Sequence, residues 1–141
     1  MSDVVFVDTN ILIYAHDRDA GQKRAKAAQA LERLWDEHTG RLSTQVLQEF
    51  YVTVTQKLAT TLTRASAREV VRMYSPWVHQ LTTTDTILRA SGLAELVQLS
   101  FWDSLILASA EQAQAAQLYS EDLNVGQTIA GIRIVNPLLA G

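Results

Sequence analysis

The chain has 141 residues, the length of one domain that buries enough surface to fold without disulfides or zinc. Hydrophobic residues make up 48% and charged residues 19%, which is typical of a globular protein rather than a disordered one. The net charge of −3 argues against broad binding of nucleic acid through a positive surface. The absence of cysteine excludes a disulfide scaffold, a thiolate zinc site and a cysteine nucleophile.

The same features bound the location and the domain organisation. No basic segment precedes the first apolar run, since Asp3 lies there, and no stretch is long and apolar enough to cross a bilayer. No linker, internal repeat or low-complexity tract interrupts the chain. We therefore expect a single domain over residues 1–141, in the cytoplasm and without a membrane partner.

Hydrophobic periodicity alternates short strands with amphipathic helices along the whole chain. Residues 4–7 are apolar on both faces, as in a strand buried within a parallel sheet. In chain order, we predict strands at 4–7, 41–43, 79–84, 118–120 and 131–135, and helices at 10–16, 22–38, 44–59, 66–74, 85–97 and 100–116. This alternation predicts an α/β sandwich with a mainly parallel sheet.

Asp8 interrupts an apolar run that extends from Val4 to Tyr14. A lone ionised carboxylate that is taken out of water is costly unless something pairs with it. Two roles are open for it: Asp8 caps the helix that follows, or it holds a cation. Ligands of parallel α/β folds bind beyond the carboxyl ends of the strands. Because Asp8 and Asp122 each follow a predicted strand, we expect both at that edge.

Three further acids, Glu49, Asp103 and Asp122, also lie among bulky apolar residues, each on a different predicted element. Each has a simple structural explanation: a solvated helix residue, a capping box begun by Ser100, and a turn residue. For all four acids together, full exposure is unexpected. Two carboxylates about 5 Å apart repel by roughly 3 kcal/mol at an effective dielectric of about 20, which a cation relieves. Oxygen ligands without Cys or His suit Mg²⁺ or Mn²⁺.

Four segments in this order and spacing, VFVDTNILIYA, STQVLQEFY, SFWDSLILASA and LYSEDLN, resemble the acidic motifs of PIN domains. More narrowly, they resemble the VapC-type ribonuclease toxins of bacterial toxin–antitoxin pairs. The tail GQTIAGIRIVNPL is similar to the closing segment of that family. This resemblance covers nearly the whole chain, and it implies a PIN-like α/β/α sandwich with a central, mainly parallel sheet of four to five strands.

The resemblance also implies the residues of the site. The core acids of the family match four positions of this chain: Asp8, Glu49, Asp103 and Asp122. In the family these acids hold Mg²⁺ or Mn²⁺ and catalyse hydrolysis of RNA phosphodiester bonds. Asn10 and Ser120 match polar positions that hold the ligands or the substrate in place. Glu121 is also acidic, but the family pattern assigns the ligand to Asp122, and strand neighbours point to opposite faces.

The family further implies an RNA substrate, a homodimer, and a cognate antitoxin protein that covers the acidic pocket. Arg64, Arg68 and Arg72 recur every four residues, so on a helix they form a basic stripe that is a candidate RNA contact. A second basic patch comprises Lys23, Arg24 and Lys26. For both groups a solvated helix face is the simpler interpretation.

Two alternatives to a nuclease remain at this point. The first is a catalytically silent PIN module that binds RNA or protein without cleaving it. The second is a phosphatase with an aspartate nucleophile. That chemistry usually needs another Asp two residues after the first, and Asn10 occupies this position here.

Overall fold

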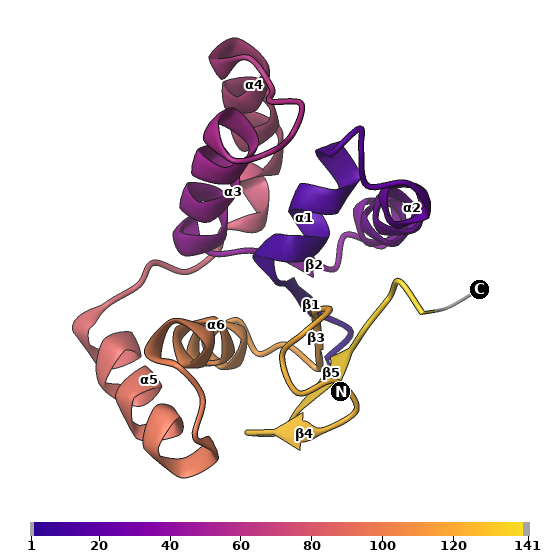
Figure 1. Ribbon diagram of the computed structural model, residues 1–141. Coiled ribbons are helices and arrows are strands. Elements are labelled where there is room, and N and C mark those ends of the chain that lie inside the picture. Colours follow the sequence, from indigo (N-terminus) through magenta and orange to yellow (C-terminus); the bar gives the residue numbers. More distant parts are fainter. Residues whose placement is uncertain (1, 140–141) are drawn as a thin grey trace.

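Figure 1 shows a computed structural model of the protein, in which residues 2–139 are described. Within these residues, five strands form one sheet in the order β2-β1-β3-β5-β4. The strands are β1 (Val5–Val7), β2 (Gly40–Arg41), β3 (Gln117–Tyr119), β4 (Thr128–Ile129) and β5 (Ile132–Val135). Every neighbouring pair is parallel except β4 and β5. The predicted α/β fold with a mainly parallel sheet of four to five strands is therefore confirmed.

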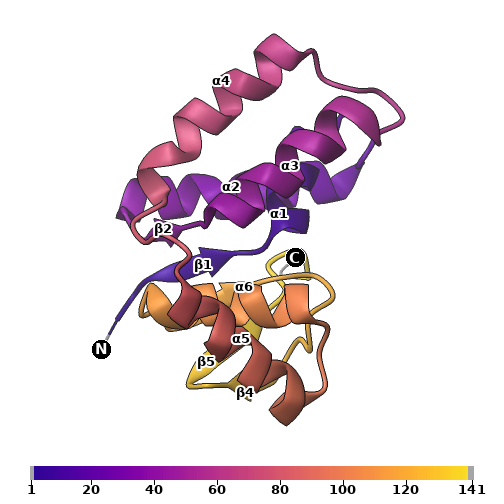
Figure 2. The same cartoon turned by 90° about the vertical axis from the view of Figure 1, so that its left-hand side faces the viewer.

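Helices cover both faces of this sheet. The helical elements are α1 (Thr9–His16), α2 (Gln22–Glu37), α3 (Thr44–Gln56), α4 (Arg64–Tyr74), the 3-10 turn η1 (Ser75–Trp77), α5 (Thr84–Val97) and α6 (Phe101–Gln112). Helices α1 to α4 lie on one side of β1, and α5 and α6 lie on the other (Figure 2). Among the described residues no single helix is long and apolar enough to cross a membrane; α5 and α6 reach that length only together, across a bend of 117°.

Side-chain caps determine where several helices begin. The hydroxyl groups of Ser43, Thr63 and Ser100 accept backbone N–H groups from the first turns of α3, α4 and α6, respectively. These caps satisfy N–H groups that have no partner within the helix. At the start of α6, the N–H group that the Ser100 hydroxyl accepts, at 3.1 Å, belongs to Asp103 in the first turn.

The strand predicted at 79–84 is wrong. The structure has no strand there, and β2 remains the edge of the sheet. The side chain of Leu81 is 71% exposed, so it has no core position to fill. Thr83 instead accepts the Thr86 N–H at 3.3 Å and begins α5. The β-branched residues of this segment thus serve as a helix cap rather than a strand.

The short strand β4 was not predicted. It pairs antiparallel with β5 through a two-residue turn at Ala130 and Gly131, both of which have positive φ angles of 52° and 79°. Positive φ at both turn positions is the geometry of a tight hairpin, for which glycine is well suited. The sequence signal was weak because alanine rarely takes the first of these positions.

Gly40 in β2 makes a close contact that joins the sheet to its helices. A Cβ atom at this position would lie 2.6 Å from the ring of Trp77, so a larger residue does not fit. Trp77 in turn packs against Trp35 and Tyr74, with ring centroids 4.6 Å and 5.0 Å away. This aromatic cluster connects α2, α4 and η1, and it packs against β2 at the edge of the sheet.

Candidate active site

An open pocket of about 540 Å³ lies beyond the carboxyl end of β1, and residues of α1, α3, α6 and the loop after β3 line it. The pocket wall includes all four acids that the sequence singled out: Asp8, Glu49, Asp103 and Asp122. They come from four separate parts of the chain. The expected convergence of these residues at one edge of the sheet is therefore found in the structure.

Asp8 forms the floor of this pocket. Its backbone N–H donates to the Tyr119 carbonyl at 2.9 Å, which continues the pairing of β1 with β3. The side chain is only 8% exposed and accepts two hydrogen bonds, from the Thr9 N–H at 2.7 Å and from the Ser120 hydroxyl at 2.8 Å. Asp8 thus caps α1 and also faces the pocket, so the two roles left open by the sequence do not exclude each other.

Burial raises the pKa of Asp8 to about 6. The hydrogen bonds from Ser120 and Thr9 oppose this rise in pKa, whereas the nearby charges of Asp122 and Asp103 add to it. Desolvation disfavours the charged form of a carboxylate, and like charges have the same effect. A cation close to Asp8 would therefore favour the ionised form.

Two side-chain hydrogen bonds hold neighbouring acids in place. The Thr9 hydroxyl donates to Glu49 Oε1 at 2.6 Å and joins α1 to α3. The Asn10 side-chain N–H donates to Asp122 Oδ1 at 3.0 Å and joins α1 to the loop after β3. Asn10, the expected positioning residue, thus lies beside Asp122, whereas the contribution of Thr9 was missed. The position of Thr9 directly after Asp8 was the sequence signal that could have identified this residue.

Asp8 is the only buried acid of the four, since Glu49, Asp103 and Asp122 are exposed in the open pocket. The apolar residues around these three acids belong to the core behind them. Asp103 lies in the first turn of α6, where the positive end of the helix dipole favours a carboxylate. The acids therefore converge without being taken out of water together.

Glu121 faces away from this pocket and forms a separate cluster that we call the Glu121 clamp: Tyr14, Lys23 and Glu121. The Tyr14 hydroxyl donates to Glu121 Oε1 at 2.5 Å, and Lys23 Nζ lies 2.6 Å from Glu121 Oε2. Lys23 also lies 4.9 Å above the centre of the Tyr14 ring. Asp122, not Glu121, lines the acidic pocket, as expected. Alternation along a strand does not explain this difference, because both acids follow the end of β3. The pairing of Glu121 with Tyr14 and Lys23 explains it instead.

The acidic pocket offers a donor set that suits a divalent cation, namely carboxylate oxygens and the Asn10 amide. Asn10 Oδ1 is buried and has no hydrogen-bond partner among the described residues. As the side chains stand, residues 2–139 contain no group of three or more His, Asp or Glu close enough to hold a metal ion. Mg²⁺ usually keeps several waters and takes only one or two carboxylates directly. The donors thus fit a largely hydrated Mg²⁺ or Mn²⁺.

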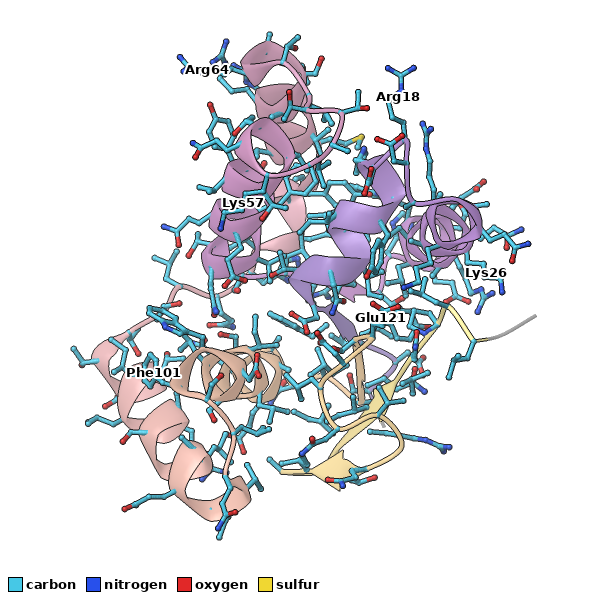
Figure 3. The ribbon with its side chains drawn as sticks, in the orientation of Figure 1. Arg18, Lys26, Lys57, Arg64, Phe101 and Glu121 are labelled. Carbon is cyan, nitrogen blue, oxygen red and sulfur yellow. The ribbon has the colours of Figure 1, made fainter. Side chains whose placement is uncertain are left out.

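The predicted basic stripe lies elsewhere. Arg64, Arg68 and Arg72 are on α4, and none of them lines the acidic pocket. Arg68 borders a separate apolar groove of about 450 Å³ between α3 and α4, and Arg72 forms an ion pair with Glu69. Arg64 lies at the far end of α4 from the sheet (Figure 3). The structure therefore does not place these arginines at the site.

The pocket wall also contains a cation that sequence reasoning missed. Lys57 follows α3 directly, and Thr53 lies between it and Glu49 on the same helix face. Residues four apart share a helix face, so the spacing of Glu49, Thr53 and Lys57 was the available signal.

Comparison with known proteins identifies the family. The family model described as PIN domain matches residues 5–128. The chain therefore belongs to the PIN domain family. No significant match was found among curated proteins.

Three solved structures share this fold. A toxin–antitoxin complex from Klebsiella pneumoniae is 24% identical, covers 95% of this chain and 97% of its own, and has a TM-score of 0.66. VapBC2 from Rickettsia felis, bound to a promoter DNA fragment, is 18% identical over 93% and 96% of the two chains, with a TM-score of 0.63. VapC20 from Mycobacterium tuberculosis, a toxin that cleaves the sarcin–ricin loop, is 19% identical over 85% and 91%, with a TM-score of 0.62.

Proposed function

We propose that this PIN domain is a Mg²⁺- or Mn²⁺-dependent endoribonuclease that hydrolyses RNA phosphodiester bonds as the toxin of a toxin–antitoxin pair. The observation that carries the proposal is the convergence of Asp8, Glu49, Asp103 and Asp122 in one pocket at the carboxyl edge of the sheet. The described functions of the structural neighbours, which are toxins or toxin–antitoxin complexes, support the same assignment.

In the proposed reaction the carboxylates hold the cation, and the rest of the site orients them. A divalent cation held by these carboxylates would supply activation of water for attack on phosphorus and stabilisation of charge on the phosphoryl and leaving oxygens. Thr9 fixes Glu49, Asn10 fixes Asp122, and Ser120 fixes Asp8, each through one hydrogen bond. Partners that hold metal ligands in this way usually matter for both metal affinity and activity.

The proposal also includes protein partners. One of the neighbouring structures is described as a toxin–antitoxin complex, so we propose a cognate antitoxin for this chain. The apolar groove between α3 and α4 borders the acidic pocket, because Gln48 and Val52 line both. We also propose that the protein forms a homodimer, as expected from the family.

The first test is RNA cleavage by wild type and by Asp8→Asn, each with Mn²⁺ or with EDTA. A panel of structured RNAs that includes a sarcin–ricin loop provides the substrate. Asp85→Asn is the matched control, because Asp85 is exposed on α5 and outside the pocket. We expect Asp8→Asn to lose roughly 10²–10³-fold in rate, since the cation contributes several kcal/mol to transition-state stabilisation. Asp85→Asn should retain wild-type cleavage, and EDTA should abolish cleavage by both proteins.

The other outcomes identify what is wrong. Equal cleavage by wild type and Asp8→Asn would assign the activity to another site or to a contaminant. RNA binding without cleavage under any metal condition would favour the silent binding module.

A further inference from the structure

Lys57 is the one cationic residue among residues 2–139 that lines the acidic pocket. Its side chain is exposed and forms no ion pair with any described residue. Its backbone N–H closes α3 by donating to the Thr53 carbonyl at 2.8 Å. Helix termination therefore uses the backbone of Lys57, and no hydrogen bond or ion pair with residues 2–139 engages its ammonium group.

The position of Lys57 directly after α3 determines what its side chain can reach. Lys57 follows Glu49 by eight residues on the same face, which places the two Cα atoms about 12 Å apart along the helix axis. Lys57 and Glu49 both line the acidic pocket, so the lysine shares the pocket wall with this carboxylate and lies about two helical turns farther along the chain.

The negative charges around the pocket indicate what the Lys57 ammonium group binds. Four carboxylates line the wall, and an RNA strand brings one negative charge for each nucleotide. A cation bound by the carboxylates compensates the charge only at the phosphate beside it. A second phosphate of the same strand still faces acidic residues, unless another positive group lies within reach. Lys57 is the residue of the pocket wall that meets this need.

We propose that Lys57 binds the phosphate next to the scissile one and so orients a single RNA strand along α3. This inference rests on the proposed nuclease function and adds a substrate-contacting residue to it. It implies that the pocket holds at least two consecutive phosphates, one at the carboxylates and one at the ammonium group. A lysine serves this role as a flexible point charge with three donors.

The other two lysines of the chain show why Lys57 is distinctive. Lys23 is held by Glu121 in the Glu121 clamp. Lys26 lies on α2 and borders a different hollow of the surface. Figure 3 shows Lys26 and Lys57 on opposite sides of the view. Lys26→Gln is therefore a matched control that removes the same charge away from the acidic pocket.

The test measures RNA binding and cleavage separately. Binding of a short single-stranded RNA to Asp8→Asn is titrated at several salt concentrations, with and without Lys57→Gln or Lys26→Gln. We expect Lys57→Gln to weaken binding roughly tenfold, as for loss of one charged hydrogen bond. It should also reduce the slope of log K against log salt by about 0.7, the value for one phosphate contact on a single strand. In the cleaving protein, Lys57→Gln should raise KM more than it lowers kcat, and Lys57→Arg should restore most of the KM.

Each other result overturns the proposal in a recognisable way. If Lys57→Gln and Lys26→Gln change the salt slope equally, only the net charge matters and Lys57 has no specific contact. If wild type cleaves RNA and Lys57→Gln does so with unchanged KM, Lys57 is not a substrate contact, although the nuclease function stands. If wild type cleaves no RNA and Asp8→Asn binds none, the nuclease function fails and the role of Lys57 fails with it. Because Lys57 is exposed, the melting temperature should confirm that each variant folds.

Discussion

Asp8 and Glu121 are carboxylates at the same edge of the sheet, and Ser120, which precedes Glu121, is bonded to Asp8. In the Glu121 clamp, Glu121 pairs with the Lys23 ammonium group from α2 and with the Tyr14 hydroxyl from α1. Among the described residues, Asp8 accepts hydrogen bonds only from the neutral Thr9 N–H and Ser120 hydroxyl, and its acidic neighbours add to the rise in its pKa. Among the described residues, the negative charge of Glu121 thus has a positively charged partner, and that of Asp8 has none. An uncompensated buried carboxylate in an open pocket marks the place where an external cation stabilises the protein most.

The largest expected effect is on the pH dependence of stability. The folded protein raises the pKa of Asp8 from 3.8 to about 6, so between these values the folded state binds more protons than the unfolded state. Stability without metal therefore falls as pH rises through this window, by about 3 kcal/mol in total. Asp8→Asn removes this cost, because an amide still accepts from Thr9 and can donate to Ser120. In EDTA, the variant should exceed wild type in stability above pH 6 and lose that advantage toward pH 4.

Glu121→Gln should change the pH dependence of stability in the opposite direction to Asp8→Asn. Burial, the largest single influence, raises the pKa of Glu121, but the hydrogen bonds from Lys23 and Tyr14 and the charge of Lys23 together lower it. The contribution of Glu121 to stability is therefore present above pH 4.5 and lost as pH falls through its folded pKa. The free energy of unfolding, measured with urea at several pH values, checks both signs. The same pH trend in both variants would remove the contrast between the two acids.

Metal binding should stabilise the wild type and not Asp8→Asn. A ligand that binds only the folded state contributes about 2.7 kcal/mol at 100 times its Kd. We expect Mn²⁺ to raise the melting temperature of wild type and of Glu121→Gln, because Glu121 lies outside the acidic pocket. Asp122→Asn should respond more weakly than wild type. An equal response of wild type and Asp8→Asn to Mn²⁺ would mean that the ion binds elsewhere.

A smaller effect is expected when the Glu121 clamp is weakened. Tyr14→Phe removes the hydroxyl that donates to Glu121, and the loop that carries Asp122 loses one of its attachments to α1. We expect cleavage to fall less than the roughly tenfold that is typical when a group that orients a metal ligand directly is lost, because Tyr14 holds Glu121 and not Asp122 itself. Tyr119→Phe is the matched control, because Tyr119 does not line the acidic pocket. Unchanged cleavage by Tyr14→Phe would mean that Asn10 alone positions Asp122.

Much of this fold follows from local patterns. The apolar run of β1, the amphipathic stripes of α2 and α3, and the cap at Ser100 are properties of short segments, and hydrophobic periodicity expresses them directly. The wrong strand at 79–84 and the missed β4 show the limit of such patterns. A β-branched segment forms a strand only where an open sheet edge accepts it, and a two-residue strand exists only through its partner.

The sequence by itself determined the family, the alternation of strands and helices, and the four acids, because each acid interrupts an apolar segment. Only the tertiary structure decided how the surroundings of the charged residues at this edge of the sheet differ. The burial of Asp8, the pairing of Glu121 with Lys23, and the position of Lys57 on the pocket wall all join residues that are distant along the chain or separated by helical turns. Burial and charge pairing depend on distances in space, and no single segment of the sequence contains them.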